Sequence, residues 1–422
     1  MRRPLLIIFI VLLFIDLIHI NLKSIDVSKD NEIVIVEGLV KGKVEKQKYD
    51  QYKIGKFIVN DYGKKKSLQI GQIVKIKGRY KSLDKMKFKD FDYGRYIRST
   101  GYEAIIYVEK CEVINSNYLY ISIGKVKEYI KETLRYLYKD KSDFINSIIL
   151  GSSEYLSTEE KDMFMRTGTS HIIAISGLHT GLICSMIAFI IRGINNIYKL
   201  ILLFIIIFLY SIMVGSSPSI VRSLLFTMIM YTAIFLDRKR DGISTLSLIG
   251  IFFIINNPYI IYNASFQLSF LATLSIIYFC SYVNDIFKNR LISVTISANI
   301  LTIPIIYYSF NGIPILSILG NMIIVPCIGI IIYLSIASVA IFRINLYLAK
   351  LVAYFNKEVI NIIYYFLDKI SILSFSYIEV DNPKFYCVVI YYIILFSYMI
   401  YKELKTMKEQ ENELQGYYKE CQ

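Results

Sequence analysis

Tryptophan is absent from this 422-residue chain, histidine occurs three times, and the six cysteines form no Cys-x-x-Cys pair. Zinc sites take at least three nitrogen, sulfur or oxygen ligands from the protein, so this distribution favours no zinc site. The glycine-rich loop ending in Lys-Ser/Thr, which cradles nucleotide phosphates, is also missing. We therefore expect no metal, no cofactor and no P-loop motor in this chain.

Apolar residues are abundant. They make up 55% of the chain, and the mean hydropathy is +0.47, which is typical of an integral membrane protein. Residues 1–21 begin with Arg2 and Arg3 and continue as an apolar run. A cleaved signal peptide has the same start, but no small-x-small cleavage site follows. We expect an uncleaved membrane helix with its N-terminus inside.

Residues 22–115 are the polar exception. Alternating apolar and polar residues predict strands at 32–40, 52–59, 72–79 and 102–108, with glycines at the turns. About five short strands in fewer than 100 residues favour an OB-like barrel. The predicted fold is thus a polytopic α-helical membrane protein with an N-terminal extracytoplasmic all-β OB-like domain.

Basic residues and aromatic rings are interleaved in this domain. Residues 21–120 contain 21 Lys and Arg against 13 Asp and Glu, a net charge of +8. Phosphate pairing combined with base stacking is how such barrels hold single-stranded nucleic acid. The alternative is that the rings fill the barrel core and the lysines are solvated. The candidate DNA-binding residues are Lys64, Lys65, Lys66, Lys75, Arg79, Tyr80, Tyr93 and Arg95.

Residues 116–168 read as amphipathic, interfacial helices, with a helix start at Ser157 and acidic residues in its first turn. Residues 169–402 read as a polytopic membrane domain, and residues 403–422 as a cytoplasmic tail. Candidate spans are 172–191, 199–214, 219–236, 244–262, 265–283, 291–309, 314–342 and 384–401.

Basic loops at 237–240 and 288–290 fall on one side of these spans, which the positive-inside rule makes cytoplasmic. The same count places the basic tail outside. One more crossing must therefore lie between 314 and 380. Either 314–342 is a re-entrant pair broken near Pro326, or residues 351–373 cross.

Residues 168–182 contain two of the three histidines, His171 and His179, around Ser176 and Gly177 within an apolar run. Polar groups at membrane depth are costly unless they line a pathway or bond internally. A metal site lacks a third ligand nearby, and a serine–histidine pair three residues apart rarely has nucleophile–base geometry. Pore lining or hydrogen bonding between helices is the favoured role, and no catalytic residue is expected.

A second polar group follows. Ser217 and Pro218 predict a helix start, whose N-terminus is an anion site, and Arg222 adds a charge one turn later. These features would suit a phosphate, although Arg222 could instead snorkel to the outer interface. Gln267 lies near the start of a later span and could hydrogen-bond between helices.

These segments together resemble the ComEC competence family of membrane DNA-uptake channels. Motifs occur collinearly along most of the chain: Phe91-Asp92-Tyr93 with Tyr96, Leu150-Gly151, Phe164, Gly168, His171 to His179, Pro218-Ser219 with Arg222, Phe266 to Phe270, Pro304, and Asn321 with Pro326. The resemblance implies a channel that passes one DNA strand inward, with the outer domain receiving it. The residues carried over as pathway candidates are His171, Ser176, Gly177, His179, Ser217, Ser219, Arg222, Gln267 and Asn321.

Many family members also end in a metallo-β-lactamase-like domain, whose metal motif is not found here, so we expect no nuclease activity in this chain. The expected partners are single-stranded DNA, the lipid bilayer of the cytoplasmic membrane and, as separate proteins, a DNA receptor, a cytoplasmic helicase or motor and a nuclease. A homo-oligomer is left open. The rival functions are a transporter of small anionic solutes and an intramembrane hydrolase using Ser176.

Overall fold

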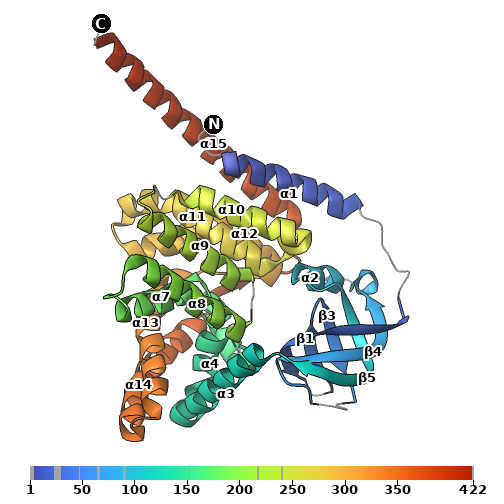
Figure 1. Cartoon of the computed structure of the whole chain (residues 1–422). Coiled ribbons are helices and arrows are strands. Elements are labelled where there is room, and N and C mark those ends of the chain that lie inside the picture. Colours follow the sequence, from blue (N-terminus) through green and yellow to red (C-terminus); the bar gives the residue numbers. More distant parts are fainter. Residues whose placement is uncertain are drawn as a thin grey trace.

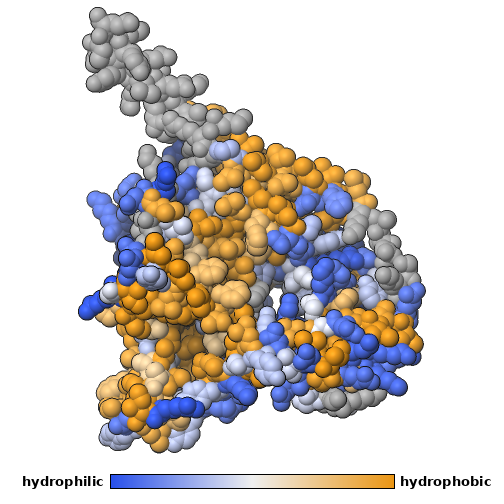
Figure 2. All heavy atoms as spheres, viewed as in Figure 1, coloured by the Kyte–Doolittle hydropathy of each residue, from blue (hydrophilic) through white to orange (hydrophobic). Residues whose placement is uncertain are grey.

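The computed structural model describes residues 4–22, 30–46, 48–63, 67–88, 92–151, 153–215, 218–238 and 241–420. A barrel of strands lies beside a larger helical domain (Figure 1). Apolar residues cover much of the visible face of the helical domain, whereas hydrophilic residues are frequent over the barrel (Figure 2). This distribution suits a helical domain embedded in a membrane.

The strands form a closed barrel of order β1-β2-β3-β5-β4. Its strands are β1 (Ile33–Glu45), β2 (Asp50–Ile54), β3 (Phe57–Asp61), β4 (Gln72–Ser82) and β5 (Ala104–Ser116). The expected barrel is confirmed, but the single strand predicted at 52–59 is wrong. Gly55, at φ +54°, makes a two-residue turn with Lys56 that separates β2 from β3. β3 pairs in parallel with β5, and the other pairs are antiparallel.

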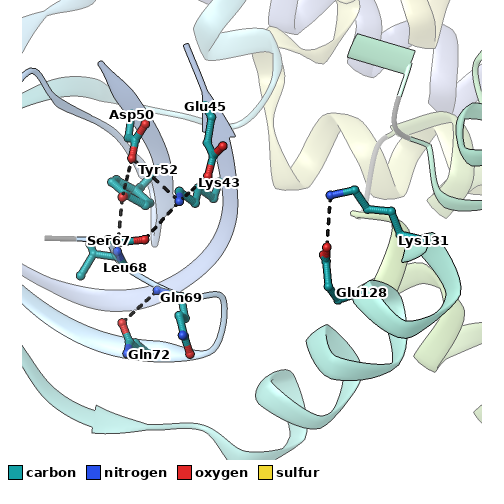
Figure 3. Close-up of polar contacts among 10 residues, drawn as sticks. All are labelled: Lys43, Glu45, Asp50, Tyr52, Ser67, Leu68, Gln69, Gln72, Glu128 and Lys131. Carbon is teal, nitrogen blue, oxygen red and sulfur yellow. Dashed lines mark hydrogen bonds and ion pairs between the residues drawn. The ribbon is translucent and has the colours of Figure 1, made fainter. Parts of the chain in front are cut away.

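Alternate residues of the strands fill the barrel, including Tyr52, Ile54, Val59 and Val74, all inaccessible to solvent. The Tyr52 hydroxyl lies 3.3 Å from Asp50 Oδ2 and accepts a hydrogen bond from the Leu68 amide. Lys43 of β1 lies 2.6 Å from Glu45 and 3.9 Å from Asp50 (Figure 3). The barrel interior is therefore apolar with one polar edge.

A short helix that the sequence pattern did not predict, α2 (Tyr93–Ser99), lies between β4 and β5. It begins at Asp92, whose side chain accepts a hydrogen bond from the Arg95 amide at 2.8 Å. Gly94 packs on the backbone before it, since an added Cβ would lie 1.9 Å from the Leu83 carbonyl oxygen. This contact fixes α2 against the barrel.

The helical domain contains α1, α3 to α15 and short 3-10 turns. Within the described residues, five helices are long and apolar enough to cross a membrane: α8 (Asn196–Val214), α11 (Ala264–Phe287), α12 (Arg290–Phe310), α13 (Ser317–Phe342) and α15 (Phe385–Glu420), the last through residues 385–402. Shorter apolar helices are α1 (Pro4–Leu22), α7 (Gly177–Ile190), α9 (Pro218–Phe235) and α10 (Gly242–Asn256). The predicted span 244–262 is wrong at its end, because Pro258 begins the separate 3-10 turn η4 (Pro258–Tyr262).

The segment expected to be interfacial contains a buried element. α3 (Tyr118–Tyr138) is amphipathic, but every residue of α4 (Ser142–Leu150) except the half-buried Asp143 is buried. The predicted helix start at Ser157 is confirmed, because α5 (Thr158–Arg166) opens with a capping box between Ser157 and Glu160. The core of the domain joins α3, α4, α5 and α7 to α13 and α14 (Leu346–Ser371).

α13 continues through Pro326, so the re-entrant alternative is wrong. α14 follows it as a second long helix, but among the described helices it is not one of those apolar enough to cross a membrane, so the crossing at 351–373 stays a prediction. The two strands flanking this helix pair, β6 (Gly312–Pro314) and β7 (Tyr377–Glu379), form an antiparallel sheet. The chain therefore leaves α12 and enters α15 at the same place. α15 also differs from the prediction, because the last span and the expected tail form one helix.

Asn356 of α14 lies at the centre of a buried hydrogen-bond network. Its amide donates to the Tyr138 hydroxyl of α3 at 3.0 Å and to the Ser335 hydroxyl of α13 at 2.9 Å. The Tyr138 hydroxyl also lies 3.1 Å from Ser338 Oγ. Three helices thus meet at one fully buried amide.

Replacing this amide should destabilise the α3–α13–α14 core. We expect Asn356→Ala to cost about 1–3 kcal/mol of stability, because it leaves buried hydroxyls without partners. Thermal unfolding of the full-length protein in detergent measures the effect. Asn361→Ala, in a half-buried position of the same helix, should unfold close to the wild-type temperature. Equal shifts in the two variants would contradict a special role for Asn356.

Candidate functional site

The histidine-rich segment is not one helix. α6 (Ser170–Ile173) ends at Ala174, whose backbone is extended, and α7 starts after the extended Ser176. The predicted continuous span 172–191 is therefore wrong. The segment lies between two helices: Gly168 packs against Ser317 at the start of α13, and Gly177 packs against Ser223 of α9.

The Ser176–His179 pair holds this break in place. Nδ1 of His179 accepts a hydrogen bond from the Ser176 amide at 3.1 Å and lies 2.9 Å from Ser176 Oγ. Because Nδ1 acts as the acceptor, the ring proton is on Nε2. Nε2 is buried and has no hydrogen-bond partner. Among the described residues no carboxylate orients the ring, so the pair resembles a helix cap more than a nucleophile with its base.

Arg222 is buried inside the helical domain, with 6% of its surface exposed. Its Nη1 donates to Thr273 Oγ1 of α11 at 2.9 Å, and Nε has no partner. The snorkelling alternative is therefore wrong. A Cβ added at Gly177 would lie 3.8 Å from Nη2, so the guanidinium lies beside the N-terminus of α7. The fold thus brings Arg222 to Ser176, Gly177 and His179.

The remaining pathway candidates have different surroundings. His171 is exposed, yet near enough to His179 for their charges to interact. Asn321 of α13 is buried with an unpartnered Oδ1, next to Gly320, which packs against Thr167 and Thr169. The Gln267 amide donates to the Ile261 carbonyl at 2.6 Å, so it holds η4 to α11. Ser217 and the Ser219 side chain lie outside the described residues.

A set of aromatic side chains forms one continuous area on the barrel, the tyrosine surface. It consists of Tyr49, Tyr62, Phe88, Tyr93, Tyr96 and Tyr107. Ring centroids are 4.6 Å apart for Tyr49 and Tyr62 and 5.9 Å for Tyr62 and Tyr107. Tyr62, Phe88 and Tyr96 are 56%, 67% and 46% exposed, which leaves their faces open to a ligand.

Charge and protonation at this surface suit an anionic ligand with flat groups. Lys46 lies over the Tyr49 ring, 5.1 Å from its centroid, and donates to its hydroxyl. Burial raises the pKa of Tyr93 and of Tyr107, so these phenols stay neutral at cellular pH. No negative charge from these two rings therefore opposes a phosphate.

Of the predicted DNA-binding residues that the structure describes, most lie outside the tyrosine surface. Lys64, Lys65 and Lys66 are outside the described residues. Lys75 and Arg79 are exposed but form ion pairs with Glu37 at 2.8 Å and Glu109 at 3.1 Å. Tyr80 is half-buried, and Tyr93 belongs to the tyrosine surface.

Comparison with known proteins bears on the helical domain. A family model described as "Competence protein" matches residues 148–405. The chain belongs to the competence protein family. ComE operon protein 3 of Bacillus subtilis (strain 168) is 26% identical over 243 residues, 56% of this chain and 31% of that protein. An uncharacterized protein of Aquifex aeolicus (strain VF5) is 27% identical over 212 residues, 48% of this chain and 50% of that protein. The match to each spans half of that relative or less.

The competence-family region and the barrel are joined through α2. Arg95 lies over the Tyr262 ring at 4.6 Å, and Arg98 over Tyr259 at 5.4 Å, so both arginines contact η4. Arg98 also donates two 2.6 Å hydrogen bonds to Asp84. The predicted DNA ligand Arg95 is thus engaged between the domains.

Several residues of the site were not predicted. Lys46, Tyr107 and Thr273 join it through pairings between distant segments, such as β3 with β5 and α9 with α11. Lys127 of α3 is another. Burial is the main cause that lowers its pKa; the charges of Glu154 and Glu128 raise it, and those of Lys131 and Lys53 of β2 lower it. The space between the barrel and α3 therefore contains both basic and acidic side chains.

Removing one arginine should loosen the barrel from the helical domain. We expect Arg98→Ala to raise amide hydrogen exchange in α2 and η4 about tenfold, because it removes the ring contact and the paired bonds to Asp84. Mass spectrometry of the full-length protein measures this. Arg79→Ala, which breaks an exposed ion pair on the barrel, should leave exchange in both segments unchanged. Unchanged exchange in Arg98→Ala would show that other contacts hold the domains together.

Proposed function

We propose that this protein is a membrane channel through which single-stranded DNA passes inward during natural transformation. Family membership supports this proposal, since competence is the state in which a cell takes up DNA. Five helices suited to crossing a membrane support a channel. The barrel, which we assign to the OB type, would lie on the outer side of the cytoplasmic membrane and receive the strand.

The tyrosine surface is the observation that carries the proposal. Exposed rings offer stacking faces to unpaired bases and not to the edges of a duplex, and Lys46 supplies a charge for a phosphate. Stacking contributes roughly 1–3 kcal/mol per base in proteins of this kind. Because every base has a flat face, such a surface accepts any sequence, as DNA uptake requires.

The proposed route leads from the barrel to the break between α6 and α7. Lys53 and Lys127, between the barrel and α3, would supply positive charges for the phosphates on the way. His171, Ser176, His179 and Arg222 would then line or brace the passage, and Asn321 would approach it from α13. Gln267 would act from the outside, by holding the turn at η4.

The charges of the loops support one orientation. Two kinds of loop alternate along the helical domain. One kind contains a basic residue: Arg192, Arg238, Lys288 or Arg343. The other kind, at 215–218, 257–263 and 311–316, has no charged residues. Under the positive-inside rule the first group is cytoplasmic. We propose that α13 and α14 cross as a pair, and the β6–β7 sheet, which keeps both ends of the pair together, supports this. This pair supplies the extra crossing and places the C-terminus of α15 inside.

Other components are expected to act in trans: a DNA receptor, a cytoplasmic motor and a nuclease for the second strand. A second candidate function is transport of small anionic solutes. The buried Arg222 favours it, because a guanidinium without an acidic partner would attract any small anion. The barrel rings have no role in that function.

Truncating an exposed ring should weaken binding of single strands. We expect Phe88→Ala or Tyr62→Ala to lower the affinity of the full-length protein for a fluorescent single-stranded oligonucleotide roughly tenfold, with a smaller effect on duplex. Tyr118→Ala is the matched control, because Tyr118 is 83% exposed but lies on α3 outside the tyrosine surface. Equal affinities of Phe88→Ala, Tyr62→Ala and the wild type would argue against stacking.

The orientation predicts which positions an impermeant reagent can reach. In a cysteine-free background, a cysteine at Asp381 should react with a membrane-impermeant maleimide in intact cells. Cysteines at Arg238 and at Ile344, between α13 and α14, should react only after permeabilisation. If the cysteine at position 344 were labelled in intact cells, α13 and α14 would not cross as a pair. If the cysteine at position 238 were labelled in intact cells, the orientation of the protein would be the opposite of the one proposed.

A further inference from the structure

The Arg222 guanidinium has unmet bonding capacity in a buried place. Its Nη1 bonds to Thr273 and its Nη2 lies 3.5 Å from Ser223 Oγ, while Nε has no partner. No carboxylate among the described residues pairs with it. A buried charge is stable only when it is paired and its donors are satisfied. The described residues therefore provide no negatively charged group to pair with Arg222.

The surroundings of the guanidinium add to the positive charge. It lies beside Gly177, the first residue of the 14-residue helix α7. The N-terminus of a helix has unpaired amide groups and a partial positive charge. Two positive centres in one buried place repel each other, so an anion between them would stabilise both.

His179 provides a second unmet donor in the same turn. It is inaccessible to solvent, and its Nε2 proton has no partner because Nδ1 is occupied by Ser176. Gly177 also lets α7 and α9 approach closely at this turn: a Cβ there would lie 3.2 Å from Ser223 Oγ, closer than most side chains tolerate. Two orphaned donors and a glycine therefore occur at one helix start.

We propose that the N-terminus of α7 and Arg222 form a binding site for one phosphate-type oxyanion. The guanidinium and the amides of Gly177 and Leu178, the two that precede the capped amide of His179, hold the oxyanion, and Ser223 lines the site. The sequence pattern had placed an anion site at the start of α9, whereas this site uses the start of α7. That the phosphate belongs to a DNA strand rests on the proposed function; binding of inorganic phosphate does not.

Thermal unfolding of the full-length protein in detergent tests the site. Inorganic phosphate, compared with chloride at equal ionic strength, should raise the unfolding temperature of the wild type. Arg222→Gln should abolish the phosphate-specific rise, and Arg222→Lys, which keeps the charge, should weaken apparent affinity about tenfold. Arg192→Gln, at an exposed arginine after α7, should respond as the wild type does. The site is refuted if the wild type shows no phosphate-specific rise or Arg222→Gln keeps it.

Proteoliposome uptake separates this site from the proposed function. Labelled single-stranded oligonucleotides with phosphodiester or uncharged methylphosphonate backbones are compared with labelled inorganic phosphate. Entry of the phosphodiester strand alone, lost in Arg222→Gln, supports both proposals. Entry of that strand at equal rates in wild type and Arg222→Gln overturns the site and keeps the channel. Arg222-dependent entry of phosphate without any oligonucleotide keeps the site and overturns the channel.

Discussion

The hydrogen bond from the Ser176 amide to His179 Nδ1 is the interaction on which the centre of this protein depends. In an apolar domain each backbone amide needs a partner within the protein, and this bond provides one where the chain stops being helical. Without it the segment would gain by continuing as a single helix. The break turns the start of α7 inward, toward α9, and this places Gly177 beside Arg222.

Local patterns predicted much of the barrel and the membrane character, because glycine turns, alternating strands and apolar runs depend on neighbouring residues. The helix start at Ser157 was predictable for the same reason. The split into α6 and α7 was not, since the N3 position of its capping box holds His179 in place of the usual Glu or Gln, and the acceptor role of histidine depends on its tautomer. α14 also escaped a firm prediction. Its apolar pattern is interrupted by Lys357, whose partner Asp140 lies more than 200 residues earlier.

The candidate site shows the same division. The sequence identified Ser176, His179 and Arg222 as polar residues out of place in an apolar region, and the structure brings them together. The sequence did not show that Arg95 faces η4, because the packing of α2 depends on the clearance at Gly94. It also did not show that Tyr107 joins Tyr49 and Tyr62, because that requires the parallel pairing of β3 with β5. The type of each residue could be interpreted from the sequence, whereas its neighbours in space could be identified only from the fold.

The barrel is attached to the helical domain at two places. One is the contact of α2 with η4. At the other, β5 runs directly into α3, where the Asn117 amide bonds to the Gly71 carbonyl at 2.7 Å and Gly71 packs on Ile121. No flexible linker separates the two domains at that junction. A molecule held on the barrel therefore stays at a fixed distance from the helices. Its effective concentration at the helical domain then does not depend on its concentration in the surrounding solution. In the proposed channel, two such anchors would make capture and entry a single event for the strand, because no diffusional search would separate them.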